Sequence, residues 1–386
     1  MSVTTAPPGV TFETISSDAS FAALGGSWDD LVRAMPRPSP LLLHGWLRSW
    51  WRHYGEGSEL AVQVAFRDGN LVGALPLVVR PKMGLRVLTF LGGNDSTLAD
   101  LLLAEGESSA IAMSLAERAA SSKHDFADFF GLPAPSKLAG ALGSPRLRLI
   151  MRAEAPVLDL TADWNTIYRT KLSKKHRALH RRRLRQLTEL GRLETKVART
   201  RDELGPALED AFRVHDLRWQ GRPDGSTFGT RTGKHFNQEA MAELAELDVP
   251  RVVTLSLDGR PIAFVCYFML ERRMYCYRLG FDPALGRFSP GLVNRFDALE
   301  AGAAEGATRI EFLGGAERYK MELADRQEPL YQALGLAQTV QGRAAVAGRL
   351  NAIRLRRFVK RSPAIRRFYY EGLAPLRRLF GRGGAT

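Results

Sequence analysis

Two glycines followed by a tyrosine–lysine pair form the segment of this sequence best suited to chemistry. The apolar residues 310–313 run into Gly314 and Gly315, and Tyr319 and Lys320 follow four residues later. Glycine lets a backbone turn sharply and approach a ligand closely, because no Cβ intervenes. A lysine that reaches back to such a turn stabilises an oxyanion or a phosphate, and a tyrosine beside it donates a proton to a leaving group. The alternative is an ordinary turn with a solvated Tyr-Lys pair.

A second candidate site lies at the start of a predicted helix. Ser289 precedes Pro290, and a serine N-cap before a proline in the first turn is a typical helix beginning. The free backbone N–H groups near Gly291 and Leu292 would then form the positive end of this helix, which is a suitable binding site for a pyrophosphate. Apolar residues spaced by three and four give this helix one apolar face, and Gly306 ends it.

Transfer of a group to an amine also needs a proton acceptor. The acids near these segments are Asp282, Glu311 and Glu317, and Asp95 and Asp100 occur in the first half. A half-buried carboxylate has a raised pKa that suits this role, but spacing alone selects none of the five. We take Asp100 and Glu317, with Tyr319 and Lys320, as the candidate catalytic residues; each acid is alternatively a cap or a surface charge.

Another candidate group lies on a predicted helix over residues 201–219. His215 and Arg218 are about one turn apart there, and Trp219 follows. This spacing suits the lining of an acceptor pocket, whereas a histidine held in the core or at the surface is the alternative. We place His215, Arg218, Trp219, Gly314 and Gly315 among the substrate-binding candidates.

The formal net charge of +14 is concentrated in two segments. Residues 169–192 contain ten Lys or Arg and one Glu, and residues 349–382 contain eleven Lys or Arg and one Glu, so the rest of the chain is net acidic. Arg177 lies on a cationic stripe of the first segment and is a further substrate-binding candidate. The segment is either a solvated face or a contact for an anion such as a cofactor phosphate, a lipid phosphate or tRNA.

The second basic segment has apolar residues at helical intervals. Ile365, Phe368, Leu376 and Leu379 alternate with arginines, as in an amphipathic helix that rests on an anionic membrane surface. A solvated or domain-packed helix pair is the alternative. No run of 18 apolar residues occurs, and the first residues lack a signal-peptide pattern. We therefore expect a cytoplasmic protein, with peripheral attachment at the inner membrane face as an option.

The chain is long enough for more than one domain, and 45% hydrophobic residues are ample for real cores. Only two cysteines, Cys266 and Cys276, occur, both in apolar runs, so we expect reduced core thiols. They are too few for a four-cysteine metal site, and we expect no metal centre.

The same local pattern occurs twice, about 190 residues apart. Residues 60–79 and 251–270 each contain an alternating apolar strand, an Asp-Gly pair (Asp68-Gly69 and Asp258-Gly259) and a second apolar strand. Asp-Gly between such strands predicts a β-hairpin with a type I′ turn. Helices are predicted at 201–219 and 234–247, and strands at 274–280 and 308–313. The chain is predicted to be α/β, with mixed sheets and flanking helices in two tandem copies of one module.

These motifs together resemble a known family. Arg278 to Pro283 (RLGFDP), Ser289 to Gly291, Glu311 to Gly315, and Tyr319-Lys320 occur in the order and spacing of the CelD-type acyltransferase domain of the GNAT superfamily. The helix containing HDLRW (215–219) and the basic residues 177–183 fit the same pattern. The paired modules resemble the double GNAT fold of the FemABX transferases. This resemblance predicts GNAT-like modules at residues 1–160 and 201–342, a basic linker at 161–200 that includes the first strand of the second module, and a basic helical tail at 343–386.

The resemblance implies an acyltransferase that takes its acyl group from acyl-CoA and gives it to an amine or hydroxyl. Sugars, polysaccharide precursors and lipid-linked intermediates are the expected acceptors. The implied cofactor-binding residues are Arg278, Arg287, Ser289, Gly291 and Leu292. The usual glycine-rich loop is replaced here by residues 287–291 (RFSPG), so an aminoacyl-tRNA donor, as in FemABX proteins, is the alternative. A non-catalytic scaffold for polysaccharide synthesis is the other alternative.

Overall fold

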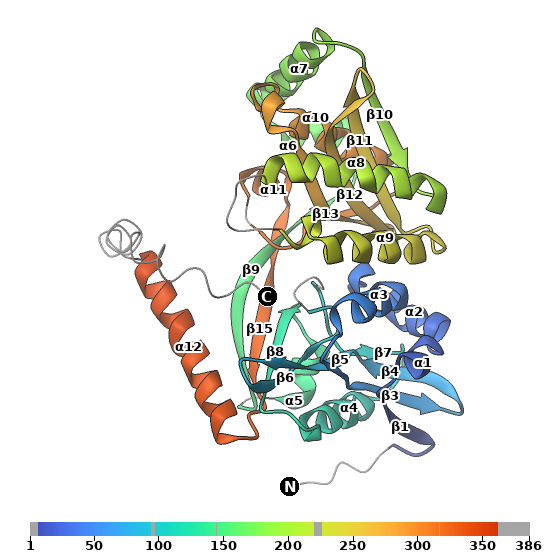
Figure 1. Cartoon of the computed structure of the whole chain (residues 1–386), viewed down its shortest axis with the longest axis vertical. Helices are drawn as coiled ribbons and strands as arrows, with labels where there is room; N and C mark the ends of the chain where they lie inside the picture. The colour runs from blue at the N-terminus through green and yellow to red at the C-terminus, as the bar shows by residue number, and fades with distance from the viewer. Residues whose placement is uncertain (1–6, 94–96, 144, 220–225, 316, 362–386) are drawn as a thin grey trace.

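The computed structural model describes residues 7–93, 97–143, 145–219, 226–315 and 317–361 (Figure 1). The strands of its first half are β1 (Val10–Ile15), β2 (Glu59–Leu60), β3 (Val62–Arg67), β4 (Asn70–Leu75), β5 (Leu77–Lys82), β6 (Leu85–Phe90), β7 (Leu102–Leu103) and β8 (Phe126–Leu132). Its helices are α1 (Asp18–Ala22), α2 (Gly25–Arg33), the 3-10 turn η1 (Pro40–Leu42), α3 (His44–Tyr54), α4 (Ser109–Ser121) and α5 (Lys137–Leu142).

The long strand β9 (Leu147–Asp159) leads into the second half. The strands there are β10 (Leu193–Ala198), β11 (Pro250–Leu257), β12 (Arg260–Leu270), β13 (Arg273–Phe281) and β14 (Arg309–Glu311). The helices are α6 (Trp164–Lys171), α7 (Lys174–Thr188), α8 (Arg201–Trp219), η3 (Thr227–Gly229), α9 (Arg231–Ala245), η4 (Pro283–Phe288), α10 (Pro290–Ala304) and α11 (Arg318–Leu323). Strand β15 (Arg326–Gly335) and helix α12 (Val340–Arg361) follow.

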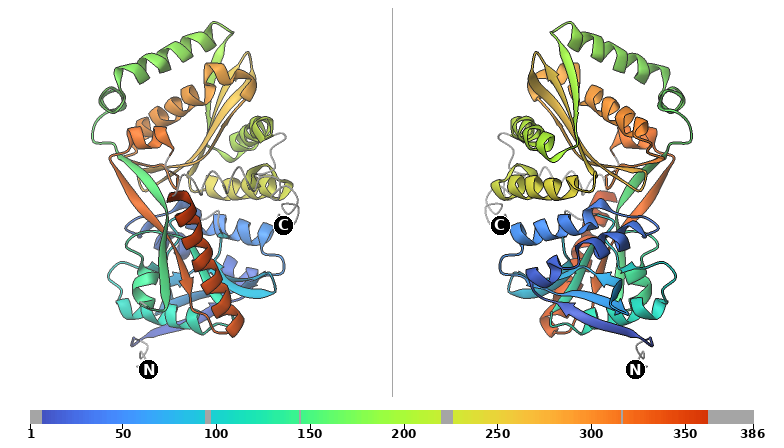
Figure 2. Two further views of the ribbon diagram at one scale, coloured as in Figure 1. Left: turned by 90° about the vertical axis from the view of Figure 1, so that its left-hand side faces the viewer. Right: turned by 90° about the vertical axis from the view of Figure 1, so that its right-hand side faces the viewer.

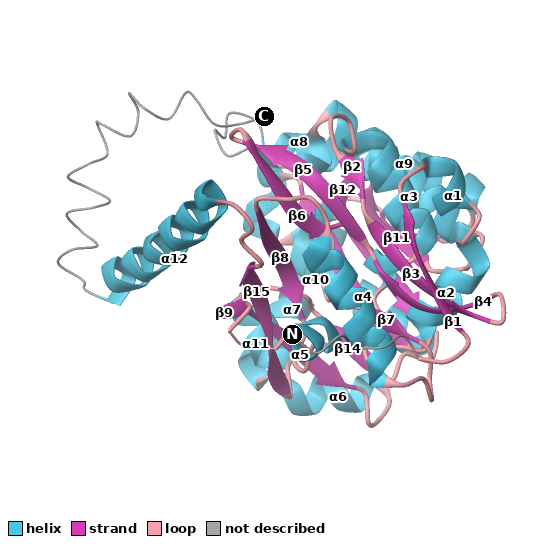
Figure 3. Cartoon of the chain, turned by 90° about the horizontal axis from the view of Figure 1, so that it is seen from below, coloured by secondary structure: helices cyan, strands magenta, loops and turns pink. Residues whose placement is uncertain are grey.

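One mixed sheet runs through both halves. Its strand order is β10-β11-β12-β13-β14-β9-β15-β8-β6-β5-β2, and a separate sheet has the order β1-β3-β4-β7. Strands β9 and β15 form the bridge, because β9 pairs with β14 near its end and with β15 along most of its length (Figures 1 and 3). Strand β15 also pairs with β8 of the first half, although it falls within the predicted 201–342 module. The domain boundaries at residues 160, 200 and 342 remain a prediction.

Both predicted hairpins are present. Arg67 pairs with Asn70, and Leu257 pairs with Arg260, so each turn has two central residues. The φ angles are 50° and 80° at Asp68 and Gly69, and 50° and 78° at Asp258 and Gly259. Positive φ at both central positions is the type I′ geometry that Asp-Gly favours.

The two halves repeat one strand arrangement, which confirms the tandem α/β fold. In the first half β6 and β8 are a short parallel pair with α4 between them in the chain, and in the second half β13 and β14 are a parallel pair with α10 between them. Helix α8 has its predicted bounds. Helix α9 begins three residues before the predicted position, because the hydroxyl of Thr230 accepts the N–H of Gly233 and caps the first turn.

Two layers of helices cover the sheet of the second half. Helices α8 and α9 pack with Phe264, Cys266 and Phe268 of β12, whereas α6 and α10 pack with Val265 and Tyr267 on the other face. Helix α3 of the first half lies on α9, as the side views show (Figure 2). The fully buried ring of Trp46 on α3 meets Phe236, Phe268 and Tyr277 edge-on, with centroids 4.8–5.6 Å apart. The first half therefore packs directly against α9, β12 and β13 of the second half.

The cysteines are free thiols, as predicted. Cys266 pairs with Arg278 and Cys276 pairs with Tyr267, so the two thiols belong to different faces of the sheet. The predicted tail residues Ile365, Phe368, Leu376 and Leu379 lie outside the described residues, as does Asp95. No helix in the described part of the chain is both long enough and apolar enough to span a bilayer.

Candidate active site

Strands β13 and β14 separate after three paired positions, and this separation creates the candidate site. Their parallel pairing runs from Arg273 with Arg309 to Tyr275 with Glu311. Beyond Glu311 the chain stays with β9, since the N–H of Phe312 donates to the carbonyl of Pro156 at 3.1 Å. Strand β13 instead continues along β12 as far as Phe281. The gap between the two chains has no backbone pairing and is open to side chains or to a ligand.

A cavity of about 390 Å³ occupies this gap. Its walls come from both faces of the sheet: Phe264 and Tyr277 belong to the face under α8, and Val265, Met274 and Leu299 belong to the face under α10. The cavity therefore passes through the sheet. A substrate that enters on one side can meet a second substrate that enters on the other.

A β-bulge in β13 shapes one wall of the cavity. Cys266 pairs with Arg278 and the next residue, Tyr267, pairs with Cys276, so Tyr277 is the extra residue. Tyr277 packs with the core on the α8 side, and Arg278 lies opposite Cys266, which belongs to the same core. The bulge thus places two consecutive side chains on the α8 side.

The α8 end of the cavity is lined by His215, Arg218, Trp219 and Ser226. The imidazole of His215 is 5% exposed, stacks on Trp219 with centroids 5.8 Å apart, and has its Nδ1 3.6 Å from Oδ1 of Asp216. Burial lowers the pKa of His215 below 6.5; Asp216 opposes this shift, and the charges of Arg278 and Arg218 add to it. His215 is therefore neutral at pH 7, in a form that accepts a proton.

The opposite end is built from α10 and α11. Nζ of Lys320 is 2.9 Å from Oε2 of Glu317 and donates to the carbonyl of Gly314 at 3.2 Å. The guanidinium of Arg295 lies 3.8 Å from the centre of the Tyr319 ring, a cation–π contact. Burial raises the pKa of the Tyr319 phenol and lowers that of the Arg295 guanidinium. Tyr319 thus stays protonated at neutral pH and can act as a proton donor.

The chain turns sharply at residues 313–315. Leu313 has φ 56° and Gly315 has φ 116°, so the chain reverses just past β14. A Cβ on Gly315 would lie 2.7 Å from Oε2 of Glu317. Gly314 lines the cavity and directs its carbonyl to Lys320. The reversal is what returns Lys320 and Tyr319 to the gap between the strands.

The cavity wall is strongly cationic. Four of its side chains are Arg218, Arg278, Arg295 and Lys320, and its one carboxylate among the described residues is Glu317. Burial raises the pKa of Glu317, but the hydrogen bond and the charge of Lys320, together with a backbone hydrogen bond, outweigh it and hold this pKa below 4.5. Cations therefore outnumber carboxylates in the described wall of the cavity, which favours an anionic ligand.

The start of α10 differs from the prediction. Ser289 is the N-cap residue, but it has φ 55° and ψ 52° and its side chain makes no capping hydrogen bond. The N–H of Leu292 is not free, because it donates to the carbonyl of Ser289 at 2.9 Å. Gly291 packs closely on the ring of Phe281, and the Arg287 guanidinium lies over Phe288. Helix α10 contributes Arg295, Ala298 and Leu299 to the cavity, and its first turn lies outside the cavity lining.

Three of the acids considered have structural partners. Asp100 is 3% exposed and accepts hydrogen bonds from Ser136 and from the amides of residues 101, 137 and 138, away from the cavity. Asp282 caps η4 and pairs with Arg260. Glu311 is buried against Arg37. Asp100 is therefore not part of the proposed site.

The basic helix α7 contributes no residue to the described cavity lining. Arg177 donates to the carbonyls of Arg169 and Leu172 at the end of α6 rather than to the cavity. His176 and His180 lie one turn apart, but they contact Glu322 and Tyr168 respectively. No group of three potential metal ligands occurs among the described residues.

The structure thus brings together eight of the residues selected from the sequence: His215, Arg218, Trp219, Arg278, Gly314, Glu317, Tyr319 and Lys320. Two further residues were not found by sequence reasoning. Arg295 sits in the middle of an amphipathic helix, where one arginine gives no signal of its own. Arg37 lies more than 200 residues before the strands that it contacts.

The segment that contains most of the cavity residues matches a known protein family. Residues 174–321 match the family described as acetyltransferase (GNAT) domain, which confirms the expected superfamily for the segment that contains the cavity. A comparison with curated proteins found no significant match.

Several solved structures share the overall fold. FemX is 11% identical, with a TM-score of 0.56 and coverage of 83% of this chain and 96% of that one. The C-terminal domain of a putative lysylphosphatidylglycerol synthetase from Agrobacterium fabrum is 14% identical, with a TM-score of 0.54 and coverage of 87% and 96%. A tandem GNAT protein from the clavulanic acid biosynthesis pathway is 14% identical, with a TM-score of 0.50 and coverage of 85% and 100%. At these identities the likeness concerns the fold, and it confirms the double GNAT arrangement.

Replacement of Gly315 by alanine should disturb the site, whereas the same change at Gly314 should not. A Cβ at Gly315 faces both an unfavourable φ and a contact at 2.7 Å, but at Gly314 its nearest neighbours are 3.6 and 3.7 Å away. We expect Gly315→Ala to lower the free energy of unfolding by about 1–3 kcal/mol, with Gly314→Ala close to wild type. Urea denaturation of both variants measures this difference, and equal stability of the two would contradict the assigned backbone role.

Proposed function

We propose that this protein transfers an acyl group from acyl-CoA to an amine or hydroxyl of a sugar, polysaccharide precursor or lipid-linked acceptor. The observation that carries the proposal is the cavity that passes through the sheet between β13 and β14, lined at one end by Lys320 and Tyr319 and at the other by His215. The thioester would lie in the gap, and the acceptor would approach from the α8 side.

Lys320 and Tyr319 have complementary roles in this proposal. The acceptor nitrogen or oxygen attacks the thioester carbon, and the ammonium of Lys320 stabilises the negative charge that develops on the carbonyl oxygen. Glu317 and the carbonyl of Gly314 hold that ammonium in place. When the intermediate collapses, the C–S bond breaks and Tyr319 protonates the thiolate of CoA.

His215 is the proposed proton acceptor. It lines the cavity, and burial, which outweighs the opposing effect of Asp216, lowers its pKa and keeps the imidazole neutral. It would take the proton that the acceptor loses as the new bond forms. Asp282, Glu311 and Asp100 do not compete for this role, since each is occupied by other contacts.

The cations at the α8 end suggest an acceptor that bears a phosphate. Arg218 and Arg278 both line this end, beside Trp219, whose ring suits the apolar face of a sugar. A sugar phosphate and a lipid-linked sugar both contain these two features. We therefore favour a phosphorylated sugar acceptor.

The donor is proposed to contact the start of α10. The residues there are Arg287, Ser289, Gly291 and Leu292. Because the N–H of Leu292 already donates to the carbonyl of Ser289, fewer N–H groups remain for a pyrophosphate than we expected from the sequence. Aminoacyl-tRNA is the second candidate donor, because the exposed basic face of α7 adjoins α10 and the fold is similar to that of FemX. The scaffold alternative requires that neither donor binds.

Acetyl-CoA should bind the purified protein, and release of its thiol should depend on an acceptor. Lys320→Met should lower kcat by about 10²–10³-fold, since one charge that stabilises the oxyanion is removed. Thiol release with glucosamine and with glucosamine 6-phosphate gives the rates, and calorimetry gives the affinity for CoA.

The matched control is Arg318→Met, which removes an 87% exposed cation on the same helix and should leave kcat unchanged. Wild-type turnover by Lys320→Met would exclude the role of Lys320. Binding of tRNA in place of CoA would move the proposal to the second donor, and binding of neither would favour a scaffold.

The pH dependence of the reaction should report His215. Because its pKa lies below 6.5, kcat/KM should be constant near neutral pH and fall only as the pH drops through that lowered pKa and the imidazole becomes charged. We expect His215→Asn to lower kcat/KM by about 10²–10⁴-fold and to remove this acidic limb. An unchanged pH–rate profile in the variant would contradict the role of His215.

Attachment to an anionic membrane surface is proposed for α12. Its first residues dock on β8, where Arg349 pairs with Asp128, but Leu355 and Phe358 are 60% and 61% exposed next to Arg354 and Arg356. Apolar and cationic side chains on one exposed helix suit the headgroup region of the inner leaflet. This would hold a cytoplasmic enzyme near a lipid-linked acceptor.

The double substitution Leu355→Glu with Phe358→Glu should reduce binding to vesicles that contain phosphatidylglycerol. Flotation of the full-length variant should recover much less protein than wild type, because two apolar contacts are lost and two repulsive charges are added. Met83→Glu, at a 95% exposed position in the turn between β5 and β6, is the control. Equal recovery of all three proteins would exclude α12 as the attachment site.

A further inference from the structure

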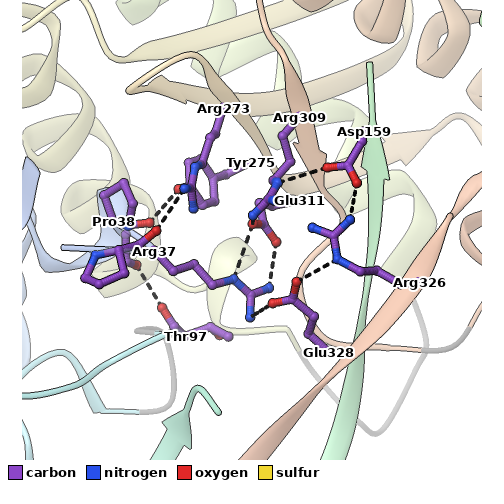
Figure 4. A network of polar contacts seen from close by, with 12 residues as sticks. Arg37, Pro38, Thr97, Asp159, Arg273, Tyr275, Arg309, Glu311, Arg326 and Glu328 are labelled. Carbon is purple, nitrogen blue, oxygen red and sulfur yellow. Dashed lines mark hydrogen bonds and ion pairs between the residues drawn. The ribbon is translucent and has the colours of Figure 1, made fainter. Parts of the chain in front are cut away.

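The point where β13 and β14 separate is held by a segment of the first half of the chain. Tyr275 and Glu311 are the last paired residues before the gap. The proline-rich residues 36–39, which follow α2, lie against both of them (Figure 4). These contacts lie outside the cavity and outside the roles proposed above.

The backbone of this segment binds β13. The hydroxyl of Tyr275 donates to the carbonyl of Pro38, and Nη2 of Arg273 donates to the carbonyl of Pro36 at 2.9 Å. The hydroxyl of Ser39 donates to the carbonyl of Thr97, which ties the segment to the rest of the first half. Alternating prolines restrict φ, so these carbonyls are presented by a stiff piece of chain.

The side chain of the same segment binds the end of β14. Nε and Nη2 of Arg37 donate to the two carboxylate oxygens of Glu311 at 3.2 and 2.6 Å, and its Nη1 is 2.7 Å from Oε2 of Glu328 on β15. Glu311 is completely buried, and the next cation, Arg309, is 3.8 Å away. A buried carboxylate without a partner is strongly unfavourable, so Glu311 depends on Arg37.

An outer set of ion pairs supports this contact. Asp159 on β9 pairs with both Arg309 and Arg326, and Arg326 also pairs with Glu328 (Figure 4). These residues come from β9, β14 and β15, the three strands that stay together beyond the gap. Arg37 therefore joins β14 and β15 to the segment that holds β13.

We propose that Arg37 is a positioning residue that fixes the separation of β13 and β14, and hence the width of the gap that receives the acyl donor. The proposal rests on the proposed function, because it assigns Arg37 a role in that reaction. Arg37 touches neither the cavity nor its ligands: it acts by holding Glu311, three residues before Gly314. The planar guanidinium spans two carboxylates, which the single ammonium of a lysine does less well.

This role predicts an effect on turnover that ordinary loss of stability does not produce. If the strand ends shift, Lys320 and Tyr319 move relative to β13, and a displacement of about 1 Å costs about 10²-fold in rate. Arg37→Ala should then lower kcat by up to about 10²-fold at a temperature where the variant is still folded. Arg37→Lys should recover part of this loss, and added guanidinium ion should recover part of it in Arg37→Ala.

The matched control is Arg33→Ala. Arg33 lies four residues earlier and also joins the two halves, through Glu271 at 2.8 Å, but both side chains are substantially exposed. Its removal should change neither kcat nor the local structure. A loss of kcat in Arg33→Ala equal to that in Arg37→Ala would show a general effect of the contact between the halves and would overturn the proposal.

Hydrogen exchange separates this proposal from the proposed function. In the full chain without substrate, amides of residues 275–281, 311–315 and 317–320 should exchange faster in Arg37→Ala than in wild type or Arg33→Ala, with Arg37→Lys between them. If wild type shows no transferase activity but this exchange pattern is found, the proposed function is wrong, whereas the role of Arg37 in holding the strand ends is supported. If Arg37→Ala exchanges like wild type, or keeps full kcat in an active enzyme, the proposed positioning role of Arg37 is wrong.

Discussion

The parallel pairing of β13 with β14 lasts only three residues, and the rest of the candidate site depends on this short contact. A sheet that stayed paired would fill the space with backbone hydrogen bonds and leave no path through it. Because the chain beyond Glu311 follows β9 instead, the ends of β13 and β14 lie apart and form two walls of the cavity. The bulge at Tyr277, the reversal at Gly315 and the apolar face of α10 then place side chains along those walls.

Charge is distributed in a way that fits this arrangement. The exposed basic residues of α7 and α12 lie on the outside, whereas a small number of cations line the cavity itself. Most of the acids near the gap are occupied: Glu311 by Arg37, Asp282 by Arg260 and Glu317 by Lys320. The described cavity wall consequently contains more cations than carboxylates, which favours anionic ligands.

Local patterns predicted much of this fold. The Asp-Gly hairpins, helix α8, the serine–proline start of α10 and the glycine turn after β14 each follow from a few neighbouring residues, and the order of motifs indicated the GNAT superfamily. The αL conformation of Ser289 and the internal bond of the Leu292 amide could not be predicted, because they depend on how η4 packs. Long-range pairing was equally hidden: neither Arg37 with Glu311 nor β15 with β8 has a sequence signal.

The central claim is that an acyl donor lies in the gap between the two strands. A crystal structure of the protein with bound acetyl-CoA tests it most directly. We expect the thioester to lie between residues 276–279 and residues 312–314, within reach of the Lys320 ammonium and the Tyr319 hydroxyl. A ligand found elsewhere, with the gap closed by side chains, would contradict it.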